Sequence, residues 1–275
     1  MGLFDGKKGL ILGVANDRSI AWAIADMIMA EGGQCGFTHL PDREDDDRKK
    51  NRRRVDKCIE KSENARNAKF VMPLNVQDDE QIVSLMERAK SEFGQIDFLL
   101  HSIAFADRDD LQRKTIETSR DGFKMAMEIS AYSLIAVCNA AQGVLADNAS
   151  VACMSYYGGE KCVPGYNVMG ICKAALEAST RYLAYDLGPR GIRVNAISAG
   201  PLKTLAGSAA GVGDMLKMYE HMAPLSRNIT HSEVGKTGLF MLSDMSTGIT
   251  GEILHIDGGY NIMGSPGRLI DVMES

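Results

Sequence analysis

The sequence predicts an α/β protein built on a doubly wound parallel sheet of seven strands with helices on both faces. Short apolar segments alternate with longer segments of helical periodicity, which is the pattern of repeated βαβ units. Several apolar segments end on Gly, Asn, Ser or Tyr. Ligands bind at the carboxyl ends of the strands in such sheets, so these endings predict one shared site.

Composition is that of an ordinary folded protein: 275 residues, 45% hydrophobic and 24% charged, with a net charge of -5. The acidic balance argues against a nucleic-acid partner. No apolar run is long enough to span a membrane and no leader opens the chain, so we expect a cytoplasmic protein without a membrane partner. The cysteines lack the short spacings of metal sites, so we expect no metal. Four of them lie in apolar patterns and are expected to be reduced core residues: Cys35, Cys138, Cys153 and Cys172.

Four strands and two clear helices are predicted in the first hundred residues. The first strand ends on Gly13, and a helix starts at Ser19, an order that presents backbone N–H groups to a phosphate although the G-x-G-x-x-G pattern is absent. A second helix is expected from Asp78 to Phe93. The expected strands are Lys8–Val14, Gln34–Leu40, Phe70–Val76 and Ile96–His101.

The second strand ends where a nucleotide-binding sheet meets the adenosine ribose. The residues from His39 to Arg43 include both an acid and a base, so they do not decide between a ribose hydroxyl and a 2′-phosphate. Residues 43–57 carry dense charges of both signs. We interpret this stretch as a solvated helix or loop rather than a nucleic-acid site.

The second half of the chain predicts three more strands. A long helix or helix pair with an apolar stripe (Phe123, Met127, Leu134, Val137, Cys138, Ala141) is expected over Thr115–Leu145. A loop of small residues over 201–213 is expected to cover the site, to be mobile in the free protein and to become ordered with cofactor. The remaining expected elements are strands Ala149–Met154, Val194–Ser198 and Gly251–Asp257, a helix from near Tyr166 to Leu187, and a helix over Ser232–Leu242.

Tyr166 and Lys173 are the strongest catalytic candidates. They are seven residues apart, and two helical turns return to nearly the same face. A lysine beside a phenol favours the phenolate and lowers the pKa of the phenol. Such a phenol can protonate an oxygen on which negative charge develops. The alternative is a partly exposed helix on which both residues are incidental.

The chain resembles the short-chain dehydrogenase/reductase superfamily along its whole length. More narrowly, it resembles the bacterial NADH-dependent enoyl-[acyl-carrier-protein] reductases of type II fatty-acid synthesis, which use Tyr-x₆-Lys with a second Tyr ten residues upstream. The motifs that carry the resemblance are Gly13-Val-Ala, Ser19-Ile-Ala, His101-Ser-Ile-Ala-Phe-Ala, Ser155-Tyr, Tyr166-Asn-Val-Met-Gly with Lys173, Arg193-Val-Asn-Ala-Ile-Ser-Ala-Gly-Pro-Leu-Lys-Thr and His255-Ile-Asp-Gly-Gly.

The resemblance implies a single Rossmann-like domain over residues 1–275 that reduces trans-2-enoyl-[acyl-carrier-protein] with NADH, as a homotetramer. Tyr166, Lys173 and Tyr156 are the implied catalytic residues, Tyr156 in the proton path or lining the pocket. The implied cofactor-binding residues are Gly13, Ser19, Ile20, Leu40, Asn75, Val76, Ser102, Ile103, Lys173, Leu202, Lys203, Thr204, Leu205 and Ala206. The implied substrate-binding residues are Ala104, Ala106, Tyr156, Tyr166 and Met169.

Two departures from the family pattern leave NADPH open as the cofactor. Asn75 stands where the family usually has Asp, and Leu40 where a polar residue commonly meets the ribose. A 2′-phosphate needs a positioned cation, and Arg43 is the nearby residue that provides one.

Other interpretations predict different behaviour. Tyr157 and Lys161 also match the commoner Tyr-x-x-x-Lys motif. The two glycines between them, and Pro164 just after them, argue against the helix that this spacing needs. A carbonyl-reducing dehydrogenase on the same fold would reduce ketones and not enoyl thioesters. A dinucleotide-sensing protein would bind cofactor without turnover. The presence of both Tyr166 and Lys173 argues against this alternative.

Overall fold

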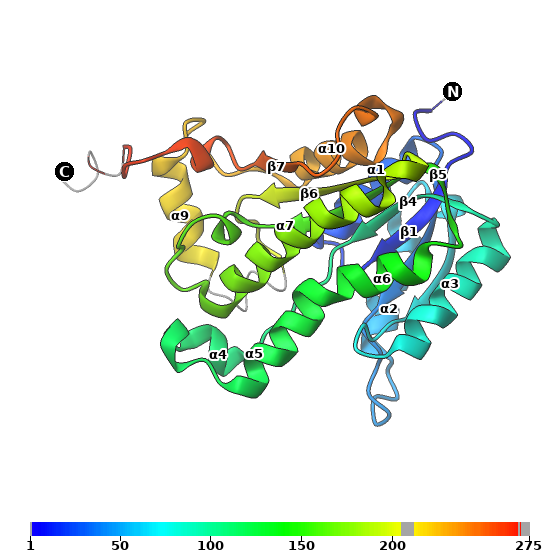
Figure 1. The fold of residues 1–275 in the computed structure, drawn as a ribbon, viewed down its shortest axis with the longest axis horizontal. Helices are drawn as coiled ribbons and strands as arrows, with labels where there is room; N and C mark the ends of the chain where they lie inside the picture. Colours follow the sequence, from blue (N-terminus) through cyan, green and yellow to red (C-terminus); the bar gives the residue numbers. More distant parts are fainter. Residues whose placement is uncertain (1, 205–211, 269, 271–275) are drawn as a thin grey trace.

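A parallel sheet runs through the centre of the molecule, with strand order β3-β2-β1-β4-β5-β6-β7 and every pair parallel (Figure 1). The computed structural model describes residues 2–204, 212–268 and 270. The predicted fold class is confirmed. Within the described residues the strands are β1 (Lys8–Leu12), β2 (Gln34–His39), β3 (Ala68–Pro73), β4 (Ile96–His101), β5 (Leu145–Ser155), β6 (Arg193–Ala199) and β7 (Ile253–Ile256).

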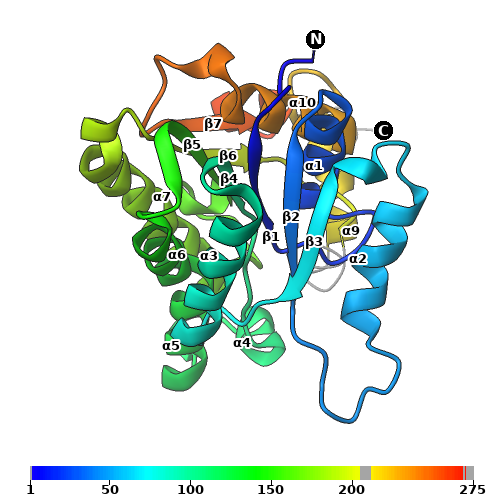
Figure 2. The same cartoon turned by 90° about the vertical axis from the view of Figure 1, so that its right-hand side faces the viewer.

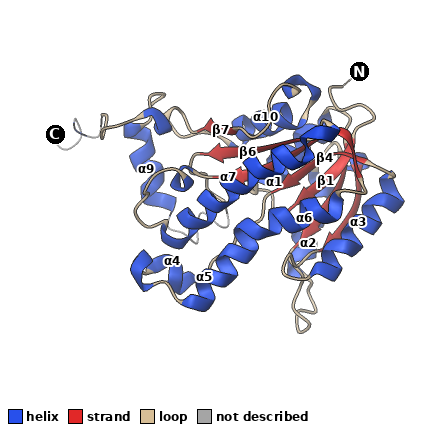
Figure 3. Cartoon of the chain, viewed as in Figure 1, coloured by secondary structure: helices blue, strands red, loops and turns tan. Residues whose placement is uncertain are grey.

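Helices cover both faces of the sheet (Figures 2 and 3). One face packs on α1 (Ile20–Ala30), α2 (Lys50–Lys61) and α10 (His231–Leu242). The other packs on α3 (Asp79–Phe93), α6 (Ser133–Ala141) and α7 (Asn167–Leu187).

Alternate residues of β1 enter the two cores, because successive side chains of a strand point to opposite faces. Leu10 and Leu12 join the α3–α6–α7 core, while Ile11 joins the α1–α2–α10 core. A sheet covered on both faces needs apolar residues on both, which is why its strands read as continuous apolar runs. The four cysteines expected in the core are buried and free.

The segment expected as a long helix or helix pair over Thr115–Leu145 is broken. It contains a short 3₁₀ turn, α5 (Arg120–Met127), one π-helical turn (Glu128–Tyr132) and α6. The Ser133 hydroxyl donates to the Ile129 carbonyl over 2.7 Å, and such competing side-chain bonds disturb regular helices. The apolar stripe holds except at Phe123, which is 38% exposed.

Strand β5 begins at Leu145 and not at the predicted Ala149. Its first part is exposed and polar at Asp147 and Asn148, so the apolar pattern did not reveal it. Arg190 holds this part by donating to the Leu145 carbonyl over 2.6 Å and to Asp147 over 2.9 Å.

Two helices were not predicted, α4 (Arg108–Gln112) and α9 (Val212–Met222). Strand β3 lies about two residues earlier than predicted, and the charged stretch 43–57 is an exposed loop followed by the start of α2. Among the described helices none is long and apolar enough to cross a membrane.

Candidate active site

Gly13 lies where the ends of β1 and β4 approach each other, at the point where the strand order reverses. Its φ of +91° is unfavourable for residues with a side chain, and a Cβ there would lie 2.2 Å from the Ser102 carbonyl oxygen and 3.1 Å from Ile103. The structure therefore brings three predicted cofactor-binding residues together at the crevice where ligands of such sheets bind.

The amino end of α1 faces the same crevice. The Ser19 hydroxyl accepts hydrogen bonds from the backbone N–H groups of Ala15 and Asn16, each over 3.0 Å, and makes no cap hydrogen bond to α1. The Ser19 side chain therefore does not cap the first N–H groups of α1, which begin at Ile20. Uncapped N–H groups and the helix dipole favour an anion such as a pyrophosphate.

The ends of β2 and β3, where the adenosine is expected, are joined by a hydrogen bond from the Leu74 N–H to the His39 carbonyl. Leu40 is 68% exposed there. The Asn75 side chain accepts from the Gln77 N–H over 3.2 Å in a local turn, and Val76 is buried beside it.

Asp42 is the carboxylate next to Leu40, but it already has partners. It accepts hydrogen bonds from the backbone N–H groups of Asn51, over 2.6 Å, and Arg52, over 3.3 Å. These bonds satisfy N–H groups at the start of α2. Asp42 is therefore a helix-capping residue, and Leu40 offers apolar contact but no charge.

Tyr156 and Tyr166 meet at the carboxyl end of β5. Tyr156 follows the strand directly, and Tyr166 is the residue before α7. Their rings are in edge contact with centroids 4.7 Å apart. The Tyr156 hydroxyl is 3.2 Å from the hydroxyl of Tyr219, with which it shares a hydrogen bond.

Lys173 is 5% exposed, and its ammonium donates to the Met154 carbonyl over 2.7 Å. An ammonium has three donors, and within the described residues this is the one hydrogen bond that Nζ makes. The remaining donors of a buried ammonium require acceptors. The hydroxyls of a nicotinamide ribose fit this requirement, so the residues present suit a dinucleotide.

The expectation that Lys173 lowers the pKa of Tyr166 is wrong. Burial raises the pKa of Tyr166, and Tyr156, Cys172 and Glu177 act in the same direction. The two-turn argument fails because Tyr166 precedes the helix and Asn167 has a φ of +43°. The phenol therefore keeps its proton at neutral pH and has a hydrogen to donate.

Besides Tyr156, two of the predicted substrate residues lie beside Tyr166. Ala106 and Met169 belong to a small apolar cluster against which Tyr166 packs. Ser130, in the π-helical turn, fixes the adjacent loop because its hydroxyl accepts from the Phe105 N–H and donates to the Phe105 carbonyl, each over 2.9 Å. Ala104 is exposed and outside the cluster.

Comparison with known proteins identifies the family. A family model described as enoyl-(acyl carrier protein) reductase matches residues 13–261. The chain belongs to this family.

Relatives in the enoyl reductase family match nearly the whole chain. A Nostoc enoyl-[acyl-carrier-protein] reductase [NADH] is 47% identical over 94% of this chain and 98% of its own length. A Bacillus cereus enoyl reductase solved with NADP+ and indole naphthyridinone has a TM-score of 0.88 and 46% identity over 96% of this chain and all (100%) of its own. An Anaplasma phagocytophilum reductase solved with NAD has a TM-score of 0.88 and 42% identity over 96% and 97% of the two chains.

The alternative Tyr-x-x-x-Lys of this enoyl reductase does not form a catalytic pair. Tyr157 starts a 3₁₀ turn over Tyr157–Gly159, and Lys161 is exposed. The Tyr157 hydroxyl donates to the Asn261 carbonyl over 3.3 Å.

Tyr219 was missed in the sequence analysis. It is 4% exposed on α9 and stacks on Tyr260 with ring centroids 3.9 Å apart. No sequence signal links it to Tyr156, because the two are 63 residues apart and α9 was not predicted.

The cover loop is described only in part. Leu202 is buried, Lys203 is exposed and Thr204 is partly buried. Leu205 and Ala206 lie outside the described residues, as do residues 207–211. The expected ordering of this loop by cofactor stays a prediction, to be tested by amide exchange across residues 202–213.

Proposed function

We propose that this chain reduces trans-2-enoyl-[acyl-carrier-protein] to acyl-[acyl-carrier-protein] with NADH during fatty-acid elongation. The observation that carries the proposal is that Tyr156, Tyr166 and the buried Lys173 all lie at the carboxyl end of β5, in a chain of the enoyl reductase family. Relatives named as NADH enoyl reductases match nearly the whole chain, which supports the same reaction here.

Each group has a role set by its position. NADH, when bound, supplies the hydride that is added to C3 of the enoyl thioester. The amino end of α1 and Gly13 hold the pyrophosphate, and Lys173 holds the nicotinamide ribose through its free donors. Tyr166 donates a hydrogen bond to the thioester oxygen as negative charge develops on it, worth about 3 kcal/mol. C2 then accepts a proton.

The acyl chain lies against the apolar cluster next to Tyr166. Ala106 and Met169 belong to this cluster, and the flexible side chain of Met169 can adapt to a hydrocarbon. Tyr156 closes the same space by its edge contact with Tyr166. Burial raises the pKa of Tyr156 to about 12, so it contributes a neutral phenol and not a charge.

NADH is the proposed cofactor rather than NADPH. Leu40 has no positive charge to bind a 2′-phosphate. Asp42 accepts hydrogen bonds from backbone N–H groups at the start of α2. Arg43 is exposed nearby and is the residue that would reverse the preference. Measured kcat/KM values that are equal or better with NADPH, and that lose this equality in Arg43→Ala, would contradict it.

We also propose that the chain, as one domain over residues 1–275, forms a cytoplasmic homotetramer that binds neither membrane nor nucleic acid. The support for assembly is the outer surface of α6 and α7, where Ile135, Tyr182 and Tyr185 are 38%, 75% and 83% exposed. Apolar and aromatic side chains gathered on neighbouring helices are typical of subunit interfaces.

The test is crotonyl-thioester reduction, followed at the nicotinamide absorbance with NADH and NADPH in turn. Reduction with NADH supports the proposal. Reduction of ketones without reduction of the thioester would assign a carbonyl-reducing dehydrogenase instead. Cofactor binding without either turnover would assign a dinucleotide-sensing protein.

A further inference from the structure

Two consecutive residues at the end of β5 bind side chains from one turn of α7. The Met154 carbonyl accepts from the Lys173 ammonium over 2.7 Å, and the Ser155 hydroxyl donates to the Glu177 carboxylate. Lys173 and Glu177 are four residues apart on α7, so their side chains are neighbours on one helix face. The next residue along the strand is Tyr156.

The turn that follows Tyr156 packs on the same part of α7. A Cβ on Gly159 would lie 2.7 Å from the Glu177 carboxylate oxygen and 3.0 Å from the Lys173 backbone carbon. The chain on both sides of Tyr156 is therefore held against one helical turn. Glu177 therefore lies against residues on both sides of Tyr156, namely Ser155 and Gly159.

Lys173 and Glu177 are both withdrawn from water, at 5% and 3% exposure. Burial lowers the pKa of Lys173, and Cys153, Cys172 and Glu177 oppose that effect. Burial raises the pKa of Cys153 and of Cys172 to about 11, so both thiols are neutral at pH 7. Glu177 is the carboxyl group among these neighbours; burial raises its pKa, whereas the hydrogen bond from Ser155 favours its charged form. A buried ammonium without a negative neighbour is strongly disfavoured.

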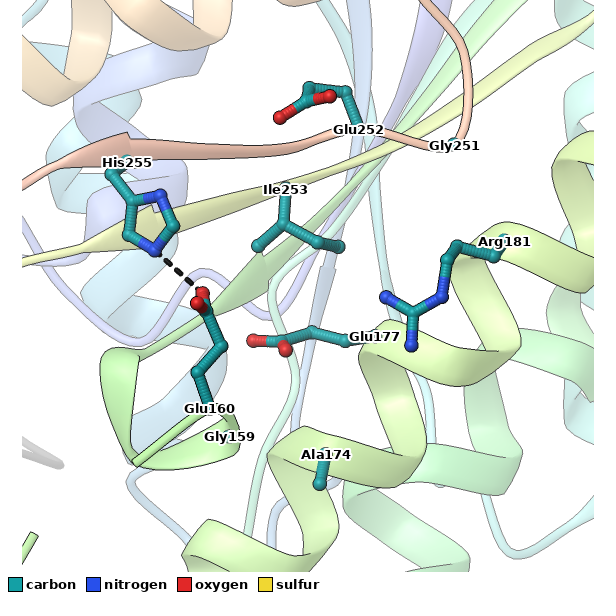
Figure 4. A pocket seen from close by; sticks show the side chains of 9 residues that line it. All are labelled: Gly159, Glu160, Ala174, Glu177, Arg181, Gly251, Glu252, Ile253 and His255. Atoms are coloured by element: carbon teal, nitrogen blue, oxygen red, sulfur yellow. Dashed lines mark hydrogen bonds and ion pairs between the residues drawn. The ribbon is translucent and has the colours of Figure 1, made fainter. Parts of the chain in front are cut away.

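The far side of Glu177 faces a cavity of about 470 Å³ between α7 and β7 (Figure 4). The pKa of Glu177 is raised, and burial is the largest cause. Glu160 acts in the same direction, whereas the Ser155 hydrogen bond, Arg181 and His255 lower the pKa. His255 is itself bound to Glu160 over 2.6 Å. The groups that face Lys173 or Glu177 from all neighbouring elements are His101, Cys153, Ser155, Glu160, Tyr166, Cys172, Arg181 and His255.

We propose that Glu177 is a positioning residue of this active site: held by Ser155, its carboxylate keeps the Lys173 ammonium charged and fixes the corner that presents Tyr156. The Glu177 carboxylate accepts the hydrogen bond from Ser155, and its effect on Tyr166 is to raise the pKa of that phenol. The inference rests on the proposed function for the role of Lys173 in holding the ribose of NADH.

The decisive variant is Glu177→Gln, which keeps the shape and an acceptor for Ser155 but removes the charge. NADH affinity is measured against pH by nicotinamide fluorescence. We expect the affinity to fall at high pH as Lys173 loses its proton, and this fall to begin about 1 pH unit lower in Glu177→Gln. Glu252→Gln removes an exposed carboxylate from the same cavity and is expected to match the wild type.

Two further variants separate an electrostatic from a merely structural role. Ser155→Ala keeps the charge of Glu177 but removes the hydroxyl that stabilises this charge. The fall in NADH affinity should therefore shift to lower pH, but by less than in Glu177→Gln. The same variant provides the test if Glu177→Gln does not fold. In a Lys173→Met background, Glu177→Gln should produce no further change in the pH dependence. A shift that persists there would overturn the inference.

The inference and the proposed function fail in different ways. A wild-type protein that reduces no crotonyl thioester would contradict the proposed function. A shifted pH dependence of NADH binding in Glu177→Gln would still support the role of Glu177. Identical pH dependence in wild type, Glu177→Gln and Ser155→Ala would overturn the inference even if the wild type is an active reductase.

Discussion

At the scale of single residues, burial decides the chemistry of the tyrosines. A phenol withdrawn from water resists ionisation, because the phenolate would lose its hydration. Burial accordingly raises the pKa of both Tyr156 and Tyr166. In the proposed reaction Tyr166 is therefore a neutral donor whose hydrogen bond strengthens as an oxyanion forms, and this contribution belongs to the transition state.

We expect Tyr166→Phe to lower kcat for crotonyl-thioester reduction by about 10²- to 10³-fold, because it removes one donor to the developing oxyanion. NADH affinity should change little, since the hydroxyl acts mainly on developing charge. Steady-state kinetics and a fluorescence titration check both values. Tyr157→Phe is the matched control: a dead Tyr157→Phe with a fully active Tyr166→Phe would show that the wrong tyrosine has been assigned.

At the scale of elements, the turn between β1 and α1 determines the cofactor end of the site. It depends on one residue without a side chain, because Gly13 combines a positive φ with contact to the Ser102 backbone. Helix α1 is in turn supported by α10, whose Gly235 and Gly238 allow contact with Met27 and Ile24. Elements distant in sequence thus fix the position of α1, at whose amino end the pyrophosphate is proposed to bind.

We expect Gly13→Ala to weaken NADH binding at least tenfold and to destabilise the protein by about 2–4 kcal/mol, because the methyl group meets a backbone carbonyl. Gly143→Ala is the control, since nothing lies within 4 Å of the place its methyl group would take and its φ is not positive. Cofactor titration and urea unfolding measure the two effects. Equal behaviour of the two variants would refute the close approach.

The capping box at the start of α10 makes stability depend on pH. Glu233 binds Arg227 and the Thr230 N–H, which lowers its pKa from 4.5 to about 2. A carboxylate with a lowered folded-state pKa contributes stability above pH 4.5, and this contribution is lost as the pH falls from 4.5 toward 2.

We expect Glu233→Ala to cost about 1 kcal/mol at pH 7, the usual value of a lost cap. The difference from the wild type should shrink as the pH is lowered from about 4.5, because the wild-type carboxylate then becomes protonated as well. Urea unfolding at pH 7 and pH 3 compares the two proteins. A difference that stays constant over this range would exclude the charge as its cause.

At the scale of the whole molecule, the two faces of the sheet differ in what lies outside them. The outer surface of α7 carries Tyr182 and Tyr185, the two most exposed tyrosines of the described residues, and Ile135 is exposed on α6. Their exposure costs free energy that a second copy would recover by covering them. The same helix carries Lys173 and Glu177 on its inner side.

We expect Tyr185→Glu to dissociate the proposed tetramer, because it places a charge where an apolar surface would be buried. Light scattering after size-exclusion chromatography measures the mass. Val83→Glu, which changes a half-exposed residue of α3, is the control and should keep the wild-type mass. An unchanged mass in Tyr185→Glu would place the interface elsewhere.

The sequence by itself determined that the sheet is parallel, that βαβ units follow one another along the chain, and at which edge of the sheet the site lies. These follow from local signals: apolar runs for strands such as Ile96–His101, and a glycine turn before a Ser-started helix at Gly13. It also offered Tyr166 and Lys173 as catalytic candidates, because both belong to a motif that can be recognised in the sequence.

Only the tertiary structure decided how those residues behave. It brought Tyr219 to Tyr156, set Glu177 against Ser155, and reversed the expected pKa direction of Tyr166. Each of these depends on burial and on partners from distant segments. Periodicity and spacing report which face a residue occupies, whereas desolvation sums over every neighbour that folding brings near, and that sum exists only once the chain has folded.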